Sequence, residues 1–378
     1  MPRRSPYYSL LFIVLLMGTV QAFFMALPRE IGKHPVVNHL LEKPEASALL
    51  LIKNGETVID RNSNTPLPLA SISKIVIALV YAEEASKGTL NPEDIISLTE
   101  LEKFYVDDEN YQNWKALGEQ EGWVNQKQVA LKYIAQGTVR FSVNTNADFL
   151  LEHIGLANIN KWLQEEGLSS HDPIFPFNAS GIVCHNIYQL PQKAFLAKMD
   201  TLSPEAYFQE VLSIQNRLAK QPKNLEENIL QQQKINNKTF LKIWSDRFSK
   251  STASDYAKIL HKLLQKEAMS SALRQQISFL FEEWAFEENP GLEEQLRHIG
   301  YKGGSTGFLL NTVLYIGDHN DNQAQVILFM NELSPKRHRV LSKVFSGFVF
   351  ELATNDVFAK TIKEVLLSST DTTNHKTK

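Results

Sequence analysis

The sequence predicts an α/β protein of the α+β type, in which one antiparallel sheet is built from both chain ends and flanked by helices. Strand-like runs lie near residues 46–60 and again at 308–330. The long stretch between them, about residues 90–290, shows mainly helical periodicity. Strands at both ends with helices in the middle predict one sheet domain with an inserted all-helical domain.

Composition limits the class of function. The chain has 378 residues, of which 43% are hydrophobic and 21% charged, so it can bury a substantial core. The formal net charge of −3 argues against a nucleic-acid partner, which usually binds a basic surface. Cys184 is the single cysteine, so no intrachain disulfide forms. The ten histidines lack metal-ligand spacing, and we expect no metal and no cofactor.

The first 28 residues have the form of an export segment. Arg3 and Arg4 precede an uncharged, apolar run from Ser5 to Pro28. Val20-Gln21-Ala22 has the small residues that a cleavage site prefers, and the run is also about 20 residues long, enough to stay as a membrane anchor. We expect residues 1–28 to be a signal peptide or an anchor, and the protein to be exported to the periplasm or cell envelope.

The sheet domain is expected to begin after a linker. Residues 29–44 contain two prolines and are interpreted as that linker, and the main domain is expected over 45–368. Strand-like residues 46–52 and 56–60 flank Asn54-Gly55, a strong signal for a β-hairpin. The polar residues 369–378 are expected to form a disordered tail.

A buried helix is predicted to follow the hairpin. It begins near Ser71, is apolar almost all round, and ends at Gly88. Further helices are predicted in the middle of the chain, at residues 124–136, 144–154, 158–166, 204–219 and 253–266.

The final strands and helix are marked by turn signals. Residues 308–316 and 325–330 flank the turn cluster 317–322, and Ser334-Pro335 is typical of a helix start. The stretch 195–250 is rich in Gln, Asn and Lys and is interpreted as solvated helices or an insertion.

Ser71 and Lys74 fit the pattern S-x-x-K. Residues three apart at a helix start lie on one face, so the lysine amine can reach the serine hydroxyl. Serine becomes a strong nucleophile only when a base takes its proton. The helix N-terminus and the Ser71 N–H can also stabilise an oxyanion. By itself the pattern fits an ordinary helix cap better than a catalytic pair.

Two further motifs follow in order. Ser142 and Asn144 form S-x-N, where the hydroxyl can relay a proton and the amide can either hold a substrate carbonyl or position Lys74. Lys302-Gly303-Gly304-Ser305 then offers a positive charge, a glycine that permits close backbone approach, and a second oxyanion N–H at Ser305. Separately these also fit a helix cap and a glycine-rich turn.

With S-x-x-K on a buried helix, S-x-N inside the helical region and K-x-G on a returning strand, the sequence resembles the penicillin-recognising serine hydrolases. It is most similar to the class A β-lactamase branch, over roughly residues 45–368. The resemblance implies an acyl-enzyme on Ser71, with Lys74 and Ser142 as catalytic residues. It also implies a small-molecule or peptidoglycan-derived substrate bound by Asn144, Lys302, Gly304 and Ser305.

Two positions depart from the family pattern. The family usually has Thr or Ser between the Lys and Gly of the third motif, where this chain has Gly303; Ser305 or Thr306 are the candidate substitutes. Class A enzymes also carry a Glu, within E-x-x-L-N, that activates the deacylating water. Residues 171–178 contain no such motif, and neither Glu166 nor Asp172 fits it well. Acylation is therefore better supported than deacylation.

Other interpretations remain open. Residues 303–307 also match G-x-S-x-G, the nucleophile elbow of α/β-hydrolases, although the apolar run after it favours a strand instead of the required helix. Within the S-x-x-K interpretation, three functions are possible: a β-lactamase-like hydrolase, a cell-wall D,D-peptidase or other acyl hydrolase with slow β-lactam turnover, and a non-catalytic envelope binding protein.

Overall fold

The computed structural model describes residues 32–374, apart from residues 107, 189 and 221–236. Its contacts divide the chain into two compact units. The described part of unit 1 comprises residues 32–72, 250–268 and 282–374, and unit 2 comprises residues 73–249 and 269–281, apart from the gaps just named. The division falls between Ile72 and Ser73, within a single helical stretch.

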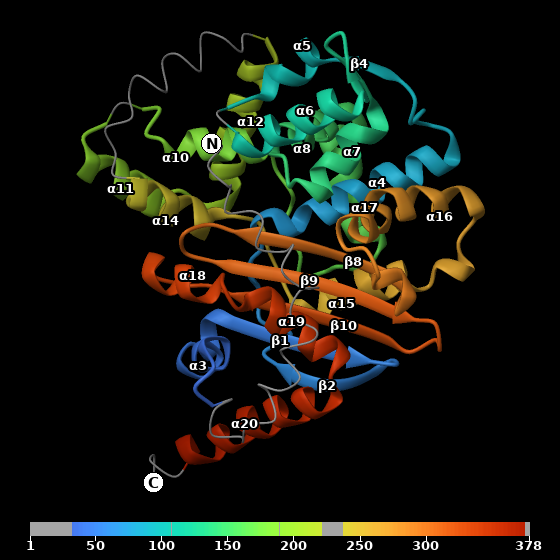
Figure 1. Ribbon diagram of the computed structural model, residues 1–378. Coiled ribbons are helices and arrows are strands. Elements are labelled where there is room, and N and C mark those ends of the chain that lie inside the picture. Colours follow the sequence, from blue (N-terminus) through green and yellow to red (C-terminus); the bar gives the residue numbers. More distant parts are fainter. Residues whose placement is uncertain (1–31, 107, 189, 221–236, 375–378) are drawn as a thin grey trace, which may run out of the picture. The chain divides into compact units, whose positions relative to one another are not determined.

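Unit 1 contains the predicted antiparallel sheet, with the strand order β2-β1-β10-β9-β8 (Figure 1). The N-terminal strand β1 pairs with the C-terminal strand β10 from Ser47↔Met330 to Lys53↔Ala324, so both chain ends build one sheet as predicted. The strands are β1 (Ser47–Lys53), β2 (Glu56–Arg61), β8 (Leu296–Ser305), β9 (Leu310–Asp318) and β10 (Gln323–Met330).

Helices cover both faces of this sheet. Successive strand side chains point to opposite faces, and every residue from 326 to 330 is buried. Helices α15 (Ala253–Leu264) and α19 (Phe345–Thr354) both pack on β1, β9 and β10. The predicted hairpin is confirmed: Asn54 and Gly55 have φ of 51° and 82°, the left-handed values of a two-residue hairpin turn. Ser334 caps α18 (Pro335–Leu341), also as predicted.

The segment 29–44, expected to be a linker, contains a helix instead. Helix α3 (Pro35–Glu42) begins after His34, whose Nδ1 accepts a hydrogen bond from the Val36 N–H. Val36, Val37 and Leu40 are fully buried, and the helix packs on β1 and α20 (Asp356–Asn374), which explains why the two prolines did not leave this segment extended. Helix α20 also runs to Asn374, into the segment 369–378 for which the sequence predicts a disordered tail.

Unit 2 is mostly helical and begins at Ser73, not near residue 90, because α4 (Lys74–Lys87) packs on other helices of this unit. The predicted helix over 124–136 starts late, at Leu131. Gln126 and Lys127 both have positive φ and close a short hairpin before it, which belongs to a small three-stranded sheet. The strands of that sheet are β4 (Ile95–Ser97), β5 (Val124–Asn125) and β6 (Gln128–Ala130).

The main helices of unit 2 surround two central ones, α8 (Asn144–Leu150) and α10 (Phe177–Cys184). All eight residues of α10 are buried. Two described helices of the Gln-rich stretch, α12 (Pro204–Lys220) and α14 (Asn237–Arg247), pack on α10 and are not merely solvated. The remaining long helices are α6 (Glu109–Glu121), α7 (Leu131–Arg140), α9 (Leu156–Glu165), α11 (Gln192–Thr201), α12 (Pro204–Lys220), α14 (Asn237–Arg247) and α16 (Ser271–Ile277).

In the part of the chain that the structure describes, no helix combines the length and apolar character needed to cross a membrane. Residues 1–28, predicted to be a signal peptide or anchor, lie outside the described residues.

Candidate active site

Ser71 lies in a short 3-10 helix, η3 (Ala70–Ser73), which continues directly into α4. Ser71 and Lys74 are therefore three positions apart on one continuous helical stretch, which places them on the same side of it. Ala70, just before the serine, has φ of 49° although it carries a side chain and is only 2% exposed. Backbone held in this region is strained, and such residues cluster at functional sites.

Two residues of the sheet hold the segment that carries Ser71, all within unit 1. Asn311 on β9 donates from Nδ2 to the Pro68 carbonyl at 2.7 Å, while its Oδ1 accepts from the Met330 N–H at 3.0 Å. Gly304 on β8 lies so close that a Cβ there would meet the Leu69 oxygen at 2.5 Å. Only glycine permits this approach, which places the third motif against the residues beside Ser71.

Lys74 is fully buried in unit 2. Its Nζ donates to the Ser142 carbonyl oxygen at 2.5 Å and to Asn144 Oδ1 at 2.6 Å, and it lies 4.7 Å from the centre of the Phe177 ring. Burial lowers the pKa of Lys74 to about 8, although the charges of Asp108 and Asp148 oppose the shift. A neutral amine has two N–H donors and one lone pair, so these two hydrogen bonds leave the lone pair available as a base.

The S-x-N motif is shaped by the start of α8. Ser142 has φ of 59°, so it is left-handed like Ala70, and Val143 is the N-cap. The Asn144 N–H donates to Asp108 Oδ2 at 3.0 Å, which fixes the first residue of the helix. The structure thus brings Lys74 together with the Ser142 backbone and the Asn144 side chain; a proton relay by the Ser142 hydroxyl stays a prediction.

Asp148, whose charge acts on Lys74, is a residue of the candidate site that the sequence analysis missed. It is fully buried, and its two oxygens accept from the N–H groups of Phe177 at 2.6 Å and Asn178 at 2.8 Å. Burial raises the pKa of Asp148 to about 7, against the opposing effect of these hydrogen bonds and of Lys74. The carboxyl group caps α10 and holds the Phe177 ring against Lys74. An acidic residue within a predicted apolar helix was the available signal.

The third motif lies at the end of β8 in unit 1. Lys302 is 3% exposed and donates from Nζ to the Gly303 carbonyl at 2.9 Å. Burial alternates along this part of the strand, so Gly303 and Ser305 are exposed. Ser305 Oγ lies 2.8 Å from His338 Nε2 on α18, a partner that the sequence did not suggest. Residues 303–305 end β8, and the chain then turns back into the antiparallel strand β9 instead of entering a helix, so the nucleophile-elbow interpretation is excluded.

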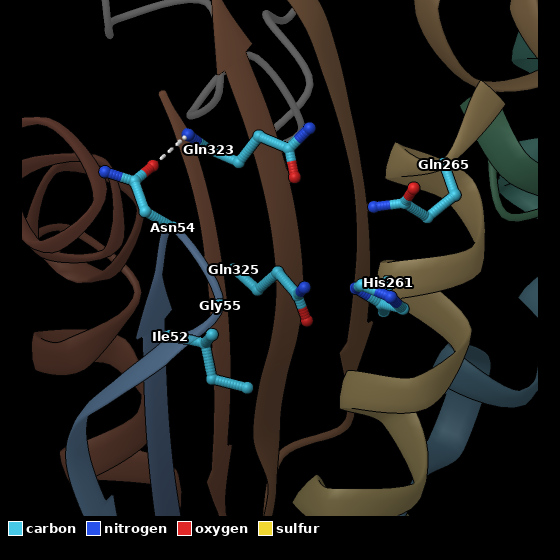
Figure 2. A pocket seen from close by; sticks show the side chains of 7 residues that line it. All are labelled: Ile52, Asn54, Gly55, His261, Gln265, Gln323 and Gln325. Atoms are coloured by element: carbon cyan, nitrogen blue, oxygen red, sulfur yellow. Dashed lines mark hydrogen bonds between the residues drawn. The ribbon is translucent and has the colours of Figure 1, made fainter. Parts of the chain in front are cut away.

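A separate cavity of about 180 Å³ lies in unit 1 beside the β1–β2 turn (Figure 2). It contains none of the predicted site residues. Asn54 Oδ1 accepts from the Gln323 N–H there at 2.7 Å, and the lining offers neutral amides and one imidazole but no paired nucleophile and base. The lining residues are Ile52, Asn54, Gly55, His261, Gln265, Gln323 and Gln325. This cavity is therefore not the candidate active site.

Comparison with known proteins identifies the family and the fold. A model of the Beta-lactamase enzyme family matches residues 38–340, well over half of the chain. No curated protein matches. Among solved structures, a class A β-lactamase from Bacteroides cellulosilyticus DSM 14838 is 14% identical, with a TM-score of 0.50, covering 91% of this chain and 99% of that one. A β-lactamase from Chitinophaga pinensis DSM 2588 is 13% identical, with a TM-score of 0.47, covering 82% and 98%.

At such identities a structural likeness shows the fold alone, and it is the fold of class A β-lactamases. The match of the family model covers the S-x-x-K, S-x-N and K-x-G motifs described above. The chain therefore belongs to the β-lactamase enzyme family.

Proposed function

We propose that the protein is a serine hydrolase that forms an acyl-enzyme on Ser71. The observation that carries this proposal is the buried Lys74, whose pKa is lowered to about 8 while its two N–H donors are engaged by Ser142 and Asn144. At pH 7 about a tenth of such a lysine is neutral. A neutral Lys74 takes the Ser71 proton, Oγ attacks the substrate carbonyl, and the leaving nitrogen is protonated as the C–N bond breaks.

Deacylation needs a group that activates water, and the carboxylates of unit 2 that lie near Lys74 are poorly suited to this task. The two carboxylates that act on Lys74 are both engaged in structural hydrogen bonds: Asp148 with the start of α10, and Asp108 with the N–H groups of Asn110 and Asn144. The apolar face of Phe177 lies over the lysine, where it disfavours water. These contacts favour slow hydrolysis of a β-lactam acyl-enzyme.

A cell-wall D,D-peptidase is the second candidate function, and the same contacts favour it. An enzyme that acylates readily but hydrolyses a β-lactam slowly is inhibited by the drug instead of destroying it. The predicted export segment, residues 1–28, fits an enzyme that meets either substrate in the cell envelope, and we propose that location for it.

Covalent labelling tests the acylation step. A fluorescent penicillin is expected to label the purified protein and to add the mass of the probe once. Ser71→Ala should abolish labelling, whereas Ser73→Ala, at the neighbouring buried serine, should retain it. No labelling of the wild-type protein at high probe concentration would reject acylation by β-lactams and favour a non-catalytic binding protein.

The lifetime of the label separates the two hydrolase functions. We expect the acyl-enzyme to persist for minutes or longer and nitrocefin to be turned over slowly. Release of D-alanine from a peptide ending in D-Ala-D-Ala would then identify the D,D-peptidase. Fast, repeated turnover of nitrocefin would instead identify a β-lactamase, with a water-activating group other than Asp108 and Asp148.

A further inference from the structure

The cavity beside the β1–β2 turn in unit 1 has a polar lining that the acylation chemistry does not use. Two of its side chains come from β10 and two from α15: Gln323, Gln325, His261 and Gln265. Figure 2 shows the pair from β10 pointing toward the pair from α15. Residues two apart on a strand share a face, as do residues four apart on a helix. The spacing along the chain therefore places hydrogen-bonding groups on two opposite walls of one cavity.

Farther along, the same helix and the same face of the sheet are apolar. Tyr256 on α15 packs edge-on against the Phe329 ring on β10, with the ring centres 5.9 Å apart. Phe329 is four residues beyond Gln325, so it lies on the same face of β10. Ile52 on β1 is directly opposite Gln325 and adds an apolar surface to the lining. The change from aromatic packing to carboxamides is thus confined to the cavity.

Gln325 is the most buried residue of this lining, and its carbonyl is unused. The residue is 5% exposed, and its Oε1 has no hydrogen-bond partner among the residues that the structure describes. A buried carbonyl without a partner costs free energy, which a bound molecule recovers by donating a hydrogen bond to it. The Asn54 side chain at the turn is already engaged, since Oδ1 accepts from the Gln323 N–H at 2.7 Å and Nδ2 donates to Asn322 Oδ1 at 3.3 Å.

We propose that this cavity binds a single sugar unit, an uncharged ring that carries several hydroxyl groups. The inference is independent of acylation at Ser71. A volume of about 180 Å³ is that of about six water molecules, which limits the occupant to about one ring. A hydroxyl donates to Gln325 Oε1, and the other hydroxyls reach the carboxamides of both walls, because each carboxamide can donate and accept. The C–H groups of the ring lie against Ile52.

The lining disfavours other molecules of this size. In the part of the chain that the structure describes, no carboxylate, ammonium or guanidinium group lines the cavity, so a charged molecule would lose its hydration without gaining an ion pair. A wholly apolar molecule would cover the Gln325 carbonyl and leave it unpaired. A compound with one amide group satisfies one wall only, whereas a sugar ring has hydroxyls on several sides.

The direct test follows the side-chain amide of Gln325 by heteronuclear NMR of the full-length protein. Glucose, galactose and N-acetylglucosamine are added separately, each up to about 100 mM. We expect the Gln325 signal to move with at least one of them, with a dissociation constant of about 1 mM, because so small a ligand binds weakly. Glucuronate, a sugar ring with a carboxylate, should bind at least about tenfold more weakly than glucose. Ser71→Ala should leave the titration unchanged.

Gln325→Met removes the amide but keeps the length of the side chain. It should weaken sugar binding at least about tenfold, measured at the Gln323 backbone N–H, without lowering the stability to urea, because an unpaired carbonyl has been removed. Gln215→Met is the matched control: Gln215 is a similarly buried glutamine, 4% exposed, but it lies in unit 2 and should not affect binding. Gln265→Ala, at an exposed residue of the lining, should weaken binding a few-fold while the protein stays folded.

The linear trimer of N-acetylglucosamine separates two sources of the ring. Binding of the trimer at least as tightly as the single sugar would support the end of a glycan chain as the ligand, and exclusion of the trimer would support a free sugar.

Three results would overturn the inference. The first is a Gln325 amide signal that does not move with any of the three single sugars. The second is equal binding of glucuronate and glucose, and the third is an equal loss of binding in Gln325→Met and Gln215→Met. None of these results depends on whether penicillin labels Ser71, so a failure of this inference is distinct from a failure of the proposed function.

Discussion

Lys74 Nζ lies 2.6 Å from Asn144 Oδ1, so the side chain of the second motif holds the amine of the first. The two residues are 70 positions apart in the chain and are both in unit 2. Because the same nitrogen also donates to the Ser142 carbonyl, its orientation is fixed by two acceptors from one short segment. A base held in this way loses little freedom when it reacts.

Replacing Asn144 by Ala should slow acylation of Ser71 about 10- to 100-fold, because a hydrogen bond to a charged group contributes about 1.5–3 kcal/mol. The measurement is the rate of labelling by a fluorescent penicillin. Asn146→Ala is the matched control: Asn146 lies on the same helix but donates to the Ile134 carbonyl, so it should lower stability without changing the rate per folded molecule. Equal slowing in both variants would contradict the assignment.

The rate of acylation should depend on pH through Lys74. Because only the neutral amine accepts a proton and its pKa is about 8, the rate should rise about tenfold per pH unit below 8 and level off above it. Lys74→Arg, which stays protonated, should remove labelling at every pH. A rate that is flat between pH 6 and 9 would show that Lys74 is not the base.

The free energy of unfolding should also depend on pH, above the pKa of Lys74. Between about pH 8 and 10.5 the unfolded Lys74 is protonated while the folded one is neutral, so the unfolded state binds more protons. The free energy of unfolding should therefore gain a contribution from Lys74 that grows as the pH rises through this window. Urea unfolding at several pH values measures it, and Lys74→Met should remove that part of the slope.

Replacing Phe177 should change the pKa of Lys74. A ring face near an ammonium favours the charged form by about 0.5–2 kcal/mol, so Phe177→Leu should lower the pKa of Lys74 and move the pH–rate curve down by about 0.4–1.5 pH units. Phe175→Leu is the control, since the Phe175 ring contacts Tyr207 and Phe208. A shift of the same size in both variants would indicate a general loosening of the loop.

The two glycines of the third motif should differ in their tolerance of a methyl group. Gly304→Ala would place a Cβ 2.5 Å from the Leu69 oxygen and should lower the free energy of unfolding by about 1–3 kcal/mol, with a loss of labelling at Ser71. Gly303→Ala meets nothing closer than 4.0 Å and should be tolerated. Urea unfolding and penicillin labelling of both variants test this, and equal behaviour would contradict the close packing of β8.

Much of the fold was predictable because its signals are local. Asn54-Gly55 specified the first hairpin, and Ser334-Pro335 specified the start of α18. The predictions failed where local and tertiary signals compete. Prolines in 29–44 favoured a linker, but burial of Val36, Val37 and Leu40 against the sheet makes it a helix. The helical periodicity of residues 124–136 did not reveal the short hairpin in its first part. The turn of this hairpin uses Gln126 and Lys127, residues that rarely adopt positive φ.

By itself, the sequence determined the order of the three motifs, because residue type and spacing along one helix or strand are written directly in the chain. It therefore identified Ser71, Lys74, Asn144 and Lys302 as candidates. Only the tertiary structure decided which groups meet them. Asp148 reaches α10 across 29 positions, and His338 reaches Ser305 across 33. Such long-range contacts depend on how helices and strands pack, which no local pattern encodes. The burial that lowers the pKa of Lys74 has the same origin.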